Sequence, residues 1–209
     1  ANKPPGLVVH PAPGNWTGTF VNALLYYCGY LPENQSKLRP GIVHRLDKDT
    51  SGVLVAAKDA LTQQKLVELF AGRKVHKEYL AICVGNPGKQ EIITKLGRDP
   101  IHRQKMAVLK EGGKEAITHC ETLQAGKELS LVKLIILTGR THQIRVHMRH
   151  IGHPVLGDPI YGFPALNKKL GVDRQMLHAA LLRFSHPITG KVMEFKAELP
   201  EDMKNFVIK

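Results

Sequence analysis

Alternating hydrophobic and polar positions predict strands in several parts of the chain. In KEYLAICVG, residues 77–85, successive side chains fall on opposite faces, and LSLVKLIIL, residues 129–137, has the composition of a second strand. Residues 183–197 form two short runs separated by a turn at 187–190, which predicts a hairpin. A further short apolar strand is expected at residues 7–9.

Apolar residues at helical spacing predict two helices in the first part of the chain. FVNALLYYC, residues 20–28, follows Thr19, and ALTQQKLVELFA, residues 60–71, follows Asp59, whose carboxylate can cap a helix. Gly72 stands where the second helix should end.

A third helix is expected within TGRTHQIRVHMRHIGH, residues 138–153. Thr141 can cap it and Gly152 can end it. The residues at core spacing are Ile144, Met148 and Ile151. A second stripe of the same helix consists of His142, Arg145 and Arg149.

The order of these elements favours an α+β fold. Strands and helices are interspersed without regular βαβ units, and residues 86–128 add short strands and a Gly112-Gly113 turn. We therefore expect a single domain over residues 1–209, with a mixed, largely antiparallel central sheet flanked by helices and loops.

Composition narrows the class of protein. The chain has 209 residues, of which 43% are hydrophobic and 23% charged, as in a globular protein with a real core. No apolar run approaches the ~18 residues that a membrane span needs, and the first ten residues lack a signal-peptide core. We expect a cytoplasmic protein without membrane contact. The three cysteines contain no CxxC pair and suggest neither disulfides nor a thiolate zinc site.

Charge points to a polyanionic partner. Thirty Lys and Arg residues against 18 acidic residues give a net charge of +12, which favours nucleic acid.

Asp47 is the first candidate for chemistry. It lies in GIVHRLDKDTSGVLVAAK, residues 41–58, on a polar connection between apolar runs at 42–43 and 53–56 that we expect to be buried strands. An ordinary turn carboxylate is the alternative, and this segment alone does not decide between them.

Two other residues could complete a site with Asp47. Arg145 can keep an acidic nucleophile ionised, although the same arginine could instead contact phosphate or solvent. Tyr79 could stack on a base or simply belong to the core.

Other site chemistries fit less well. His142, His147 and His150 lack the HExxH spacing of zinc hydrolases, and neither GxSxG nor a phosphate-binding GxxxxGK[ST] is present. DKDTS, residues 47–51, superficially resembles the nucleophile motif of haloacid dehalogenase phosphatases, but no later pair of acidic magnesium ligands is evident. In GDPIYG, Asp158 is expected to fix the backbone rather than to react.

Four segments in order resemble pseudouridine synthases of the RluA type. They are HRLDKDTSG (44–52), KEYLA (77–81), GRTHQIRVHMRHIGHPVLGDPIYG (139–162) and LHAALLRFSHP (177–187). The resemblance covers essentially the whole chain, and LVVHPAPGN looks most like the RluD subgroup, which modifies large-subunit ribosomal RNA.

The resemblance implies a fold with an active-site cleft and a role for each site residue. Asp47 would be the nucleophile, Tyr79 would lie against the target uracil, Arg145 would pair with Asp47, and Arg45 would assist base flipping. The remaining RNA-binding positions that we expect are His44, Leu46, Thr50, His142 and Arg149. No cofactor and no metal are implied, because the isomerisation involves no net redox change.

The resemblance also implies a substrate and an organisation. We expect the RNA to be large-subunit ribosomal RNA and the protein to be a monomer. Many relatives carry an N-terminal S4 RNA-binding domain; we expect that domain to be absent here and the chain to correspond to the catalytic domain. A non-catalytic RNA-binding module with the same fold is the competing hypothesis.

Overall fold

The computed structural model describes residues 1–29 and 39–206 and divides the chain into two compact units. The first unit comprises Ala1–His76 and Leu181–Ala197, and the second comprises Lys77–Ala180 and Glu198–Lys209. Strand β8 contributes residues to both units, as does β3 through its first residue. Each unit is described separately below.

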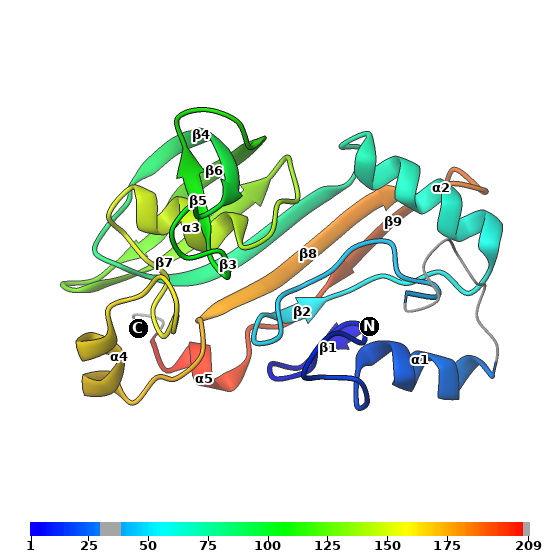
Figure 1. Cartoon of the computed structure of the whole chain (residues 1–209), viewed down its shortest axis with the longest axis horizontal. Coiled ribbons are helices and arrows are strands. Elements are labelled where there is room, and N and C mark those ends of the chain that lie inside the picture. The colour runs from blue at the N-terminus through cyan, green and yellow to red at the C-terminus, as the bar shows by residue number, and fades with distance from the viewer. Residues whose placement is uncertain (30–38, 207–209) are drawn as a thin grey trace. The chain divides into compact units, whose positions relative to one another are not determined.

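The first unit combines short strands with two helices (Figure 1). Its elements are β1 (Asn2–Lys3), α1 (Phe20–Cys28), β2 (Ser51–Val53), α2 (Ala60–Ala71), the second half of β8 (Leu177–Ser185) and β9 (Val192–Lys196). Hydrogen-bonded neighbours follow the order β1-β2-β8, and β9 also pairs with β8. The β8–β9 hairpin is antiparallel, with Ser185 opposite Val192, which confirms the predicted hairpin.

The second unit holds the longer strands. Its elements are β3 (His76–Val84), β4 (Lys89–Arg98), β5 (Met106–Leu109), β6 (Lys114–Ala125), β7 (Leu129–Ile136), α3 (Gln143–His150), α4 (Pro164–Leu170) and α5 (Glu201–Lys204). The strand order is β8-β3-β7-β6-β4-β5, and the pairs from β3 to β5 are antiparallel. Helices and a mostly antiparallel sheet confirm the predicted α+β class.

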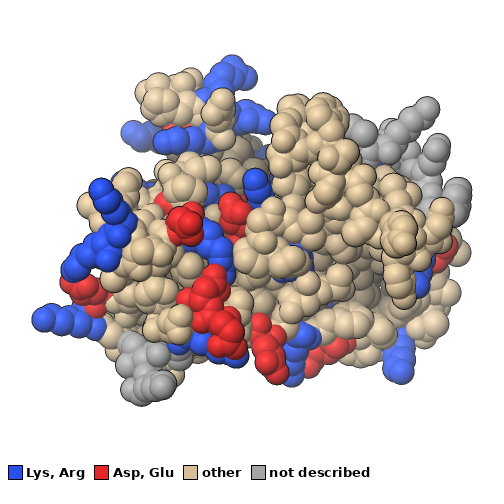
Figure 2. Space-filling model, turned by 90° about the horizontal axis from the view of Figure 1, so that it is seen from below, with Lys and Arg blue, Asp and Glu red and all other residues tan. Residues whose placement is uncertain are grey.

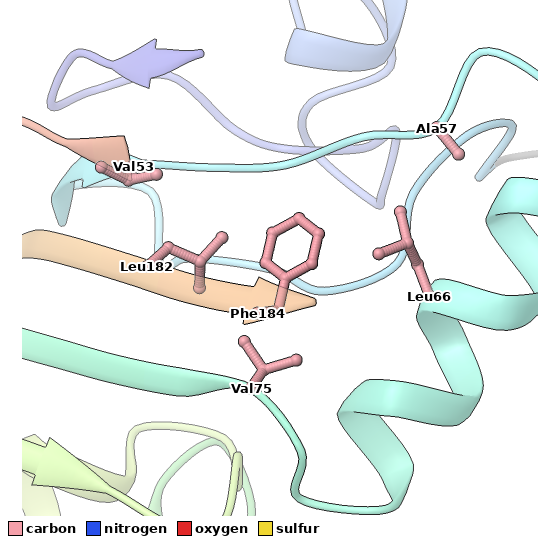
Figure 3. Packing of buried hydrophobic residues seen from close by; sticks show 6 residues of the cluster. All are labelled: Val53, Ala57, Leu66, Val75, Leu182 and Phe184. Carbon is pink, nitrogen blue, oxygen red and sulfur yellow. The ribbon is translucent and has the colours of Figure 1, made fainter. Parts of the chain in front are cut away.

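The first unit is held together by apolar side chains from β2, α2 and β8 (Figure 3). The buried members are Val53, Ala57, Leu66, Val75, Leu182 and Phe184. Burying each large side chain contributes about 1.5–3 kcal/mol, so this cluster fixes α2 and the end of the Asp47 connection on the strands.

A second cluster of buried apolar side chains lies in the second unit and includes Leu156. Its buried members are Ile82, Leu131, Leu156, Val172, Met176 and Met203. Leu156 donates its N–H to the carbonyl of Ile82 at 2.8 Å, and Ile82 donates to Met176 at 3.0 Å. The segment before Asp158 is therefore fixed against strand β3 by backbone bonds as well as packing.

Helices α1 and α2 have the predicted bounds. Thr19 caps α1, accepting a hydrogen bond from the N–H of Asn22, and the Asp59 carboxylate accepts one from Thr62 at 2.8 Å. Gly72 ends α2 with φ −76°, and the left-handed conformation falls on the next residue, Arg73, at φ 58°.

Three local predictions are wrong. Residues 7–9 do not form a strand, because the carbonyls of Val8 and Val9 accept the first N–H groups of α1. The second error concerns the strands predicted at 42–43 and 53–56. In their place the structure has the three-residue β2 and a single bridge between Ile42 and Ala56.

The third error concerns the start of α3. Thr141 does not cap this helix; the cap position is His142, in the left-handed conformation and without a side-chain capping bond. The Gln143 side chain instead accepts the backbone N–H of Arg140 at 3.0 Å and the Thr138 hydroxyl at 2.7 Å. Gln143, and not Thr141, therefore makes the side-chain hydrogen bonds at the start of α3.

Within residues 1–29 and 39–206, no helix is both long and apolar enough to span a membrane.

Candidate active site

Asp47 lies half-buried on a loop of the first unit, and the buried Lys3 side chain donates a hydrogen bond to the backbone of this loop. The carbonyl of Asp47 accepts the N–H of Thr50 at 3.1 Å, which closes a turn. The Lys3 ammonium is 1% exposed and donates to the carbonyls of Lys48 at 2.7 Å, Pro4 at 2.8 Å and Leu7 at 2.9 Å. Three carbonyl acceptors match the three donors of an ammonium, so the buried charge is solvated by backbone and fixes the residue that follows Asp47.

The residues around Asp47 divide into exposed and buried groups. Arg45 is exposed, whereas Leu46 and Thr50 are buried, at 4% and 2% exposure. The His44 ring stacks on Phe70 with centroids 4.5 Å apart, and its Nε2 accepts the N–H of Val55 at 3.0 Å. The loop therefore packs against the first unit through three of its side chains, those of His44, Leu46 and Thr50. Their contact with RNA stays a prediction.

His10 is a buried imidazole of the first unit. Its side chain is 6% exposed, and among the described residues its Nδ1 has no hydrogen-bond partner. Burial, with the positive charges of Arg39 and Arg45, lowers the pKa of His10 to about 4, so the ring is neutral at neutral pH.

Arg145 forms a buried bidentate ion pair with Asp158 in the second unit. The Arg145 Nε donates to Asp158 Oδ2 at 2.7 Å, and a terminal nitrogen donates to Oδ1 at 2.9 Å. The two side chains are 4% and 0% exposed. The Asp158 Oδ1 also accepts the N–H groups of Ile160 and Tyr161, each at 2.9 Å, which confirms its predicted role in fixing the backbone. Its second role, as the partner of Arg145, is not evident from the sequence.

Tyr161 connects this ion pair to the start of α3. The guanidinium carbon of Arg145 lies 5.2 Å from the centre of the Tyr161 ring. The Tyr161 hydroxyl accepts the backbone N–H of Met106 at 2.9 Å and lies 2.9 Å from Nδ1 of His142. The left-handed backbone of His142, at φ 55°, is thus stabilised by a side-chain hydrogen bond next to the arginine.

The other predicted residues of the second unit occupy different environments. Tyr79, on β3, is 8% exposed, and Arg149, on α3, is exposed with its guanidinium carbon 4.9 Å from the centre of the Phe163 ring. Asp47 belongs to the first unit and Tyr79 and Arg145 to the second. The pairing of Asp47 with Arg145 and the stacking of Tyr79 on uracil stay predictions.

His147 lies inside the second unit, between two hydroxyls. It is 0% exposed, with Nδ1 2.9 Å from the Thr118 hydroxyl and Nε2 2.8 Å from the Thr94 hydroxyl. Burial, and to a lesser extent the charge of His150, lowers its pKa to about 4. Among the described residues no group of three or more His, Cys, Asp or Glu side chains is placed to hold a metal ion.

The comparison with known proteins decides the family. Residues 1–150 match the family described as RNA pseudouridylate synthase. The chain belongs to this family. The predicted family is thereby confirmed.

Curated members of the family are similar over nearly the whole chain. Ribosomal large subunit pseudouridine synthase D of Zymomonas mobilis is 49% identical over 97% of the chain and 67% of its own length. The protein of the same name from Neisseria meningitidis is 49% identical over 97% of the chain and 56% of its own length. An uncharacterized RNA pseudouridine synthase, YlyB, of Bacillus subtilis is 46% identical over 99% of the chain and 67% of its own length. The chain therefore spans between about half and two thirds of these relatives.

Solved structures of the family have the same fold. Human RNA Pseudouridylate Synthase Domain Containing 4 has a TM-score of 0.74 at 27% identity, covering 97% of this chain and 85% of that one. Human RNA Pseudouridylate Synthase Domain Containing 1 has a TM-score of 0.71 at 31% identity, covering 86% and 74%.

Proposed function

We propose that this chain is the catalytic part of an RNA pseudouridine synthase that acts on large-subunit ribosomal RNA, with Asp47 as its nucleophile. The observation that carries the proposal is the family match over residues 1–150, because this segment contains Asp47, Tyr79 and Arg145 together. The names of the relatives from Zymomonas mobilis and Neisseria meningitidis support the large ribosomal subunit as the source of the RNA.

In the proposed reaction Asp47 attacks a flipped-out uridine. Asp47 forms a bond to the nucleotide, the N1–C1′ bond breaks, and the uracil turns. A C5–C1′ bond then forms and the bond to Asp47 breaks, which restores the carboxylate; C5 loses its proton and N1 gains one. The number of electrons on the nucleotide does not change, so the reaction needs neither a cofactor nor a metal. The fixed backbone after Asp47 supports this role, since a nucleophile must be held in line with the bond it attacks.

Arg145 is proposed to keep Asp47 ionised. The two hydrogen bonds to Asp158 fix the guanidinium at a buried position, where its positive charge can stabilise a nearby carboxylate. Asp158 would then orient Arg145, and Arg145 would orient Asp47. Tyr79 is proposed to lie against the uracil.

RNA capture is proposed to rest on the net charge of +12 and on Arg45, His142 and Arg149. Figure 2 shows one face of the molecule, where Lys and Arg side chains lie among acidic ones instead of forming one unbroken patch. Specific basic positions, and not only the overall charge, should therefore matter. We further propose that the protein works as a monomer in the cytoplasm.

The test is tritium release from C5-labelled uridine in large-subunit ribosomal RNA transcripts, in the presence of EDTA. The chain should release tritium, and Asp47→Asn should not. Asp49→Asn, which removes the same charge two residues away in the same loop, should release it as the wild type does. Salt-sensitive RNA binding without any release would favour the non-catalytic module, and release that EDTA abolishes would contradict a metal-free mechanism.

A further inference from the structure

The second unit contains a groove of about 380 Å³ beside helix α3. Its walls come from β5 and the turn before it, from α3, and from residues 160–162. The lining residues on β5 and its turn are Asp99, Lys105, Met106, Ala107 and Val108. Those on the other walls are Val146, Arg149, His150, Ile160, Tyr161 and Gly162. The volume lies within the ~300–1,000 Å³ typical of pockets that hold a small organic group.

The polar side of the groove is cationic. Lys105 and Arg149 contribute two full positive charges, and His150 adds an imidazole. The opposing carboxylate, Asp99, accepts the backbone N–H groups of Ile101 at 2.8 Å and His102 at 2.9 Å, so it is engaged in shaping its own turn. The groove therefore favours an anionic ligand.

The other side of the groove is apolar and continuous with the core. Val146 and Tyr161 are buried members of a cluster with Leu96 and Ala116, and Met106 and Val108 pack against it while remaining half exposed. A flat, uncharged ring can lie on such a surface. Cationic groups beside an apolar floor match the two parts of a nucleotide, its phosphate and its base.

The groove is built from groups already held in place. Tyr161 is fixed at its hydroxyl by the N–H of Met106, and Arg149 lies over the Phe163 ring at 4.9 Å. A ligand would therefore find these walls pre-organised, which lowers the entropic cost of binding. Tyr161 also contacts Arg145, so the groove adjoins the proposed catalytic arginine through one shared side chain.

We propose that this groove binds one nucleotide of the substrate RNA that flanks the target uridine, with its base on Met106 and Val108 and its phosphodiester at Lys105 and Arg149. The identification of that RNA rests on the proposed function; the binding site itself does not. A sequence preference at one position beside the modified uridine would follow from the shape of this floor.

Two variants separate the base from the phosphate. Met106→Ala shortens the apolar floor without changing any charge, and it should raise the dissociation constant for a short fluorescein-labelled oligouridylate by about fivefold, because the base loses apolar contact area. The dependence of its binding on salt should stay as in the wild type. Arg149→Ala, at an exposed position where folding is not at risk, should weaken binding and reduce the slope of log K against log salt by about 0.7.

The control is Lys127→Ala, which removes one positive charge from the turn between β6 and β7; Lys127 does not line the groove. Lys105→Ala should weaken binding clearly more than Lys127→Ala does. Equal effects of the two, or unchanged affinity in both Met106→Ala and Arg149→Ala, would overturn the groove proposal. All binding is measured in the Asp47→Asn background, so turnover plays no part: loss of the proposed function appears as missing tritium release, and loss of the groove proposal as unchanged affinity.

Discussion

Replacing Asp158 with asparagine removes one charge from the buried ion pair without changing the size of the side chain. In the wild type the carboxylate receives two N–H bonds from Arg145, at 2.7 and 2.9 Å, and two from backbone groups at 2.9 Å. Asparagine can keep the backbone bonds through its oxygen. Its amide nitrogen, however, is a donor and would face the guanidinium, which is also a donor.

The expected cost follows from burial. Arg145 is 4% exposed and Asp158 is 0% exposed, so the arginine would lose its carboxylate partner where water cannot replace it. Breaking a buried pair in this way typically costs about 3–5 kcal/mol. Since the whole chain is expected to be stable by only about 5–15 kcal/mol, Asp158→Asn should lower the free energy of unfolding by a large fraction.

The matched control is Asp202→Asn. Arg174 pairs with Asp202 through the same two-bond geometry, at 2.6 and 2.7 Å, but the Asp202 side chain is 45% exposed. Water already reaches the Asp202 carboxylate, and the 11% exposed Arg174 also donates to the carbonyl of Gln175, so the expected cost is smaller, about 1–2 kcal/mol. Urea unfolding of both variants measures the difference. Equal costs, or a cost below about 1 kcal/mol for Asp158→Asn, would refute the reasoning from burial.

The same pair should matter for turnover. If Asp158 orients Arg145 and Arg145 orients Asp47, then Asp158→Asn should lower kcat for tritium release under conditions where the protein is still folded. Asp202→Asn should leave kcat unchanged. A fully active Asp158→Asn variant would show that Arg145 does not need this carboxylate to act.

Three further predictions concern stability. At His147 the unfolded chain binds more protons than the folded chain, because the folded-state pKa is about 4 against a usual 6.5. His147 should therefore contribute about 3 kcal/mol to the fall in the free energy of unfolding as the pH drops from 6.5 to 4. Urea titrations of His147→Gln across this range should show a shallower fall, and an unchanged one would contradict the assignment. Gly157→Ala should lower the melting temperature and the free energy of unfolding, the latter by about 3 kcal/mol, because its φ is +76° and a Cβ would clash with the Arg174 carbonyl oxygen. Gly171→Ala, at φ +64° with open space around it, should cost only about 1 kcal/mol. Lys3→Met should lower the free energy of unfolding by about 2 kcal/mol and also lower tritium release, because the carbonyl of Lys48 loses its ammonium donor. An unchanged melting temperature and unchanged activity would contradict that role.

The sequence predicts elements whose signals are local. The bounds of α2 follow from the Asp59 cap and from Gly72, and β3 follows from strict alternation, with Tyr79 and Ala81 buried on one face. Such signals depend on neighbouring residues only. The α+β class and the β8–β9 hairpin were predictable for the same reason.

The sequence does not predict contacts between distant segments. The Lys3 ammonium is buried where it donates hydrogen bonds to three carbonyls, one of them that of Lys48, 45 residues away, and no local pattern marks that contact. The left-handed cap at His142 depends on Tyr161, 19 residues later. Asp158 was correctly expected to fix its own turn, yet its partner Arg145 lies 13 residues earlier and could not be assigned from spacing.

The most direct test of the central claim is to map pseudouridine in large-subunit ribosomal RNA transcripts after incubation with the chain, using carbodiimide modification and primer extension. The wild type should produce stops at a defined uridine, and Asp47→Asn should produce none while still binding the RNA. The same stops with Asp47→Asn would contradict the assignment of Asp47 as the nucleophile.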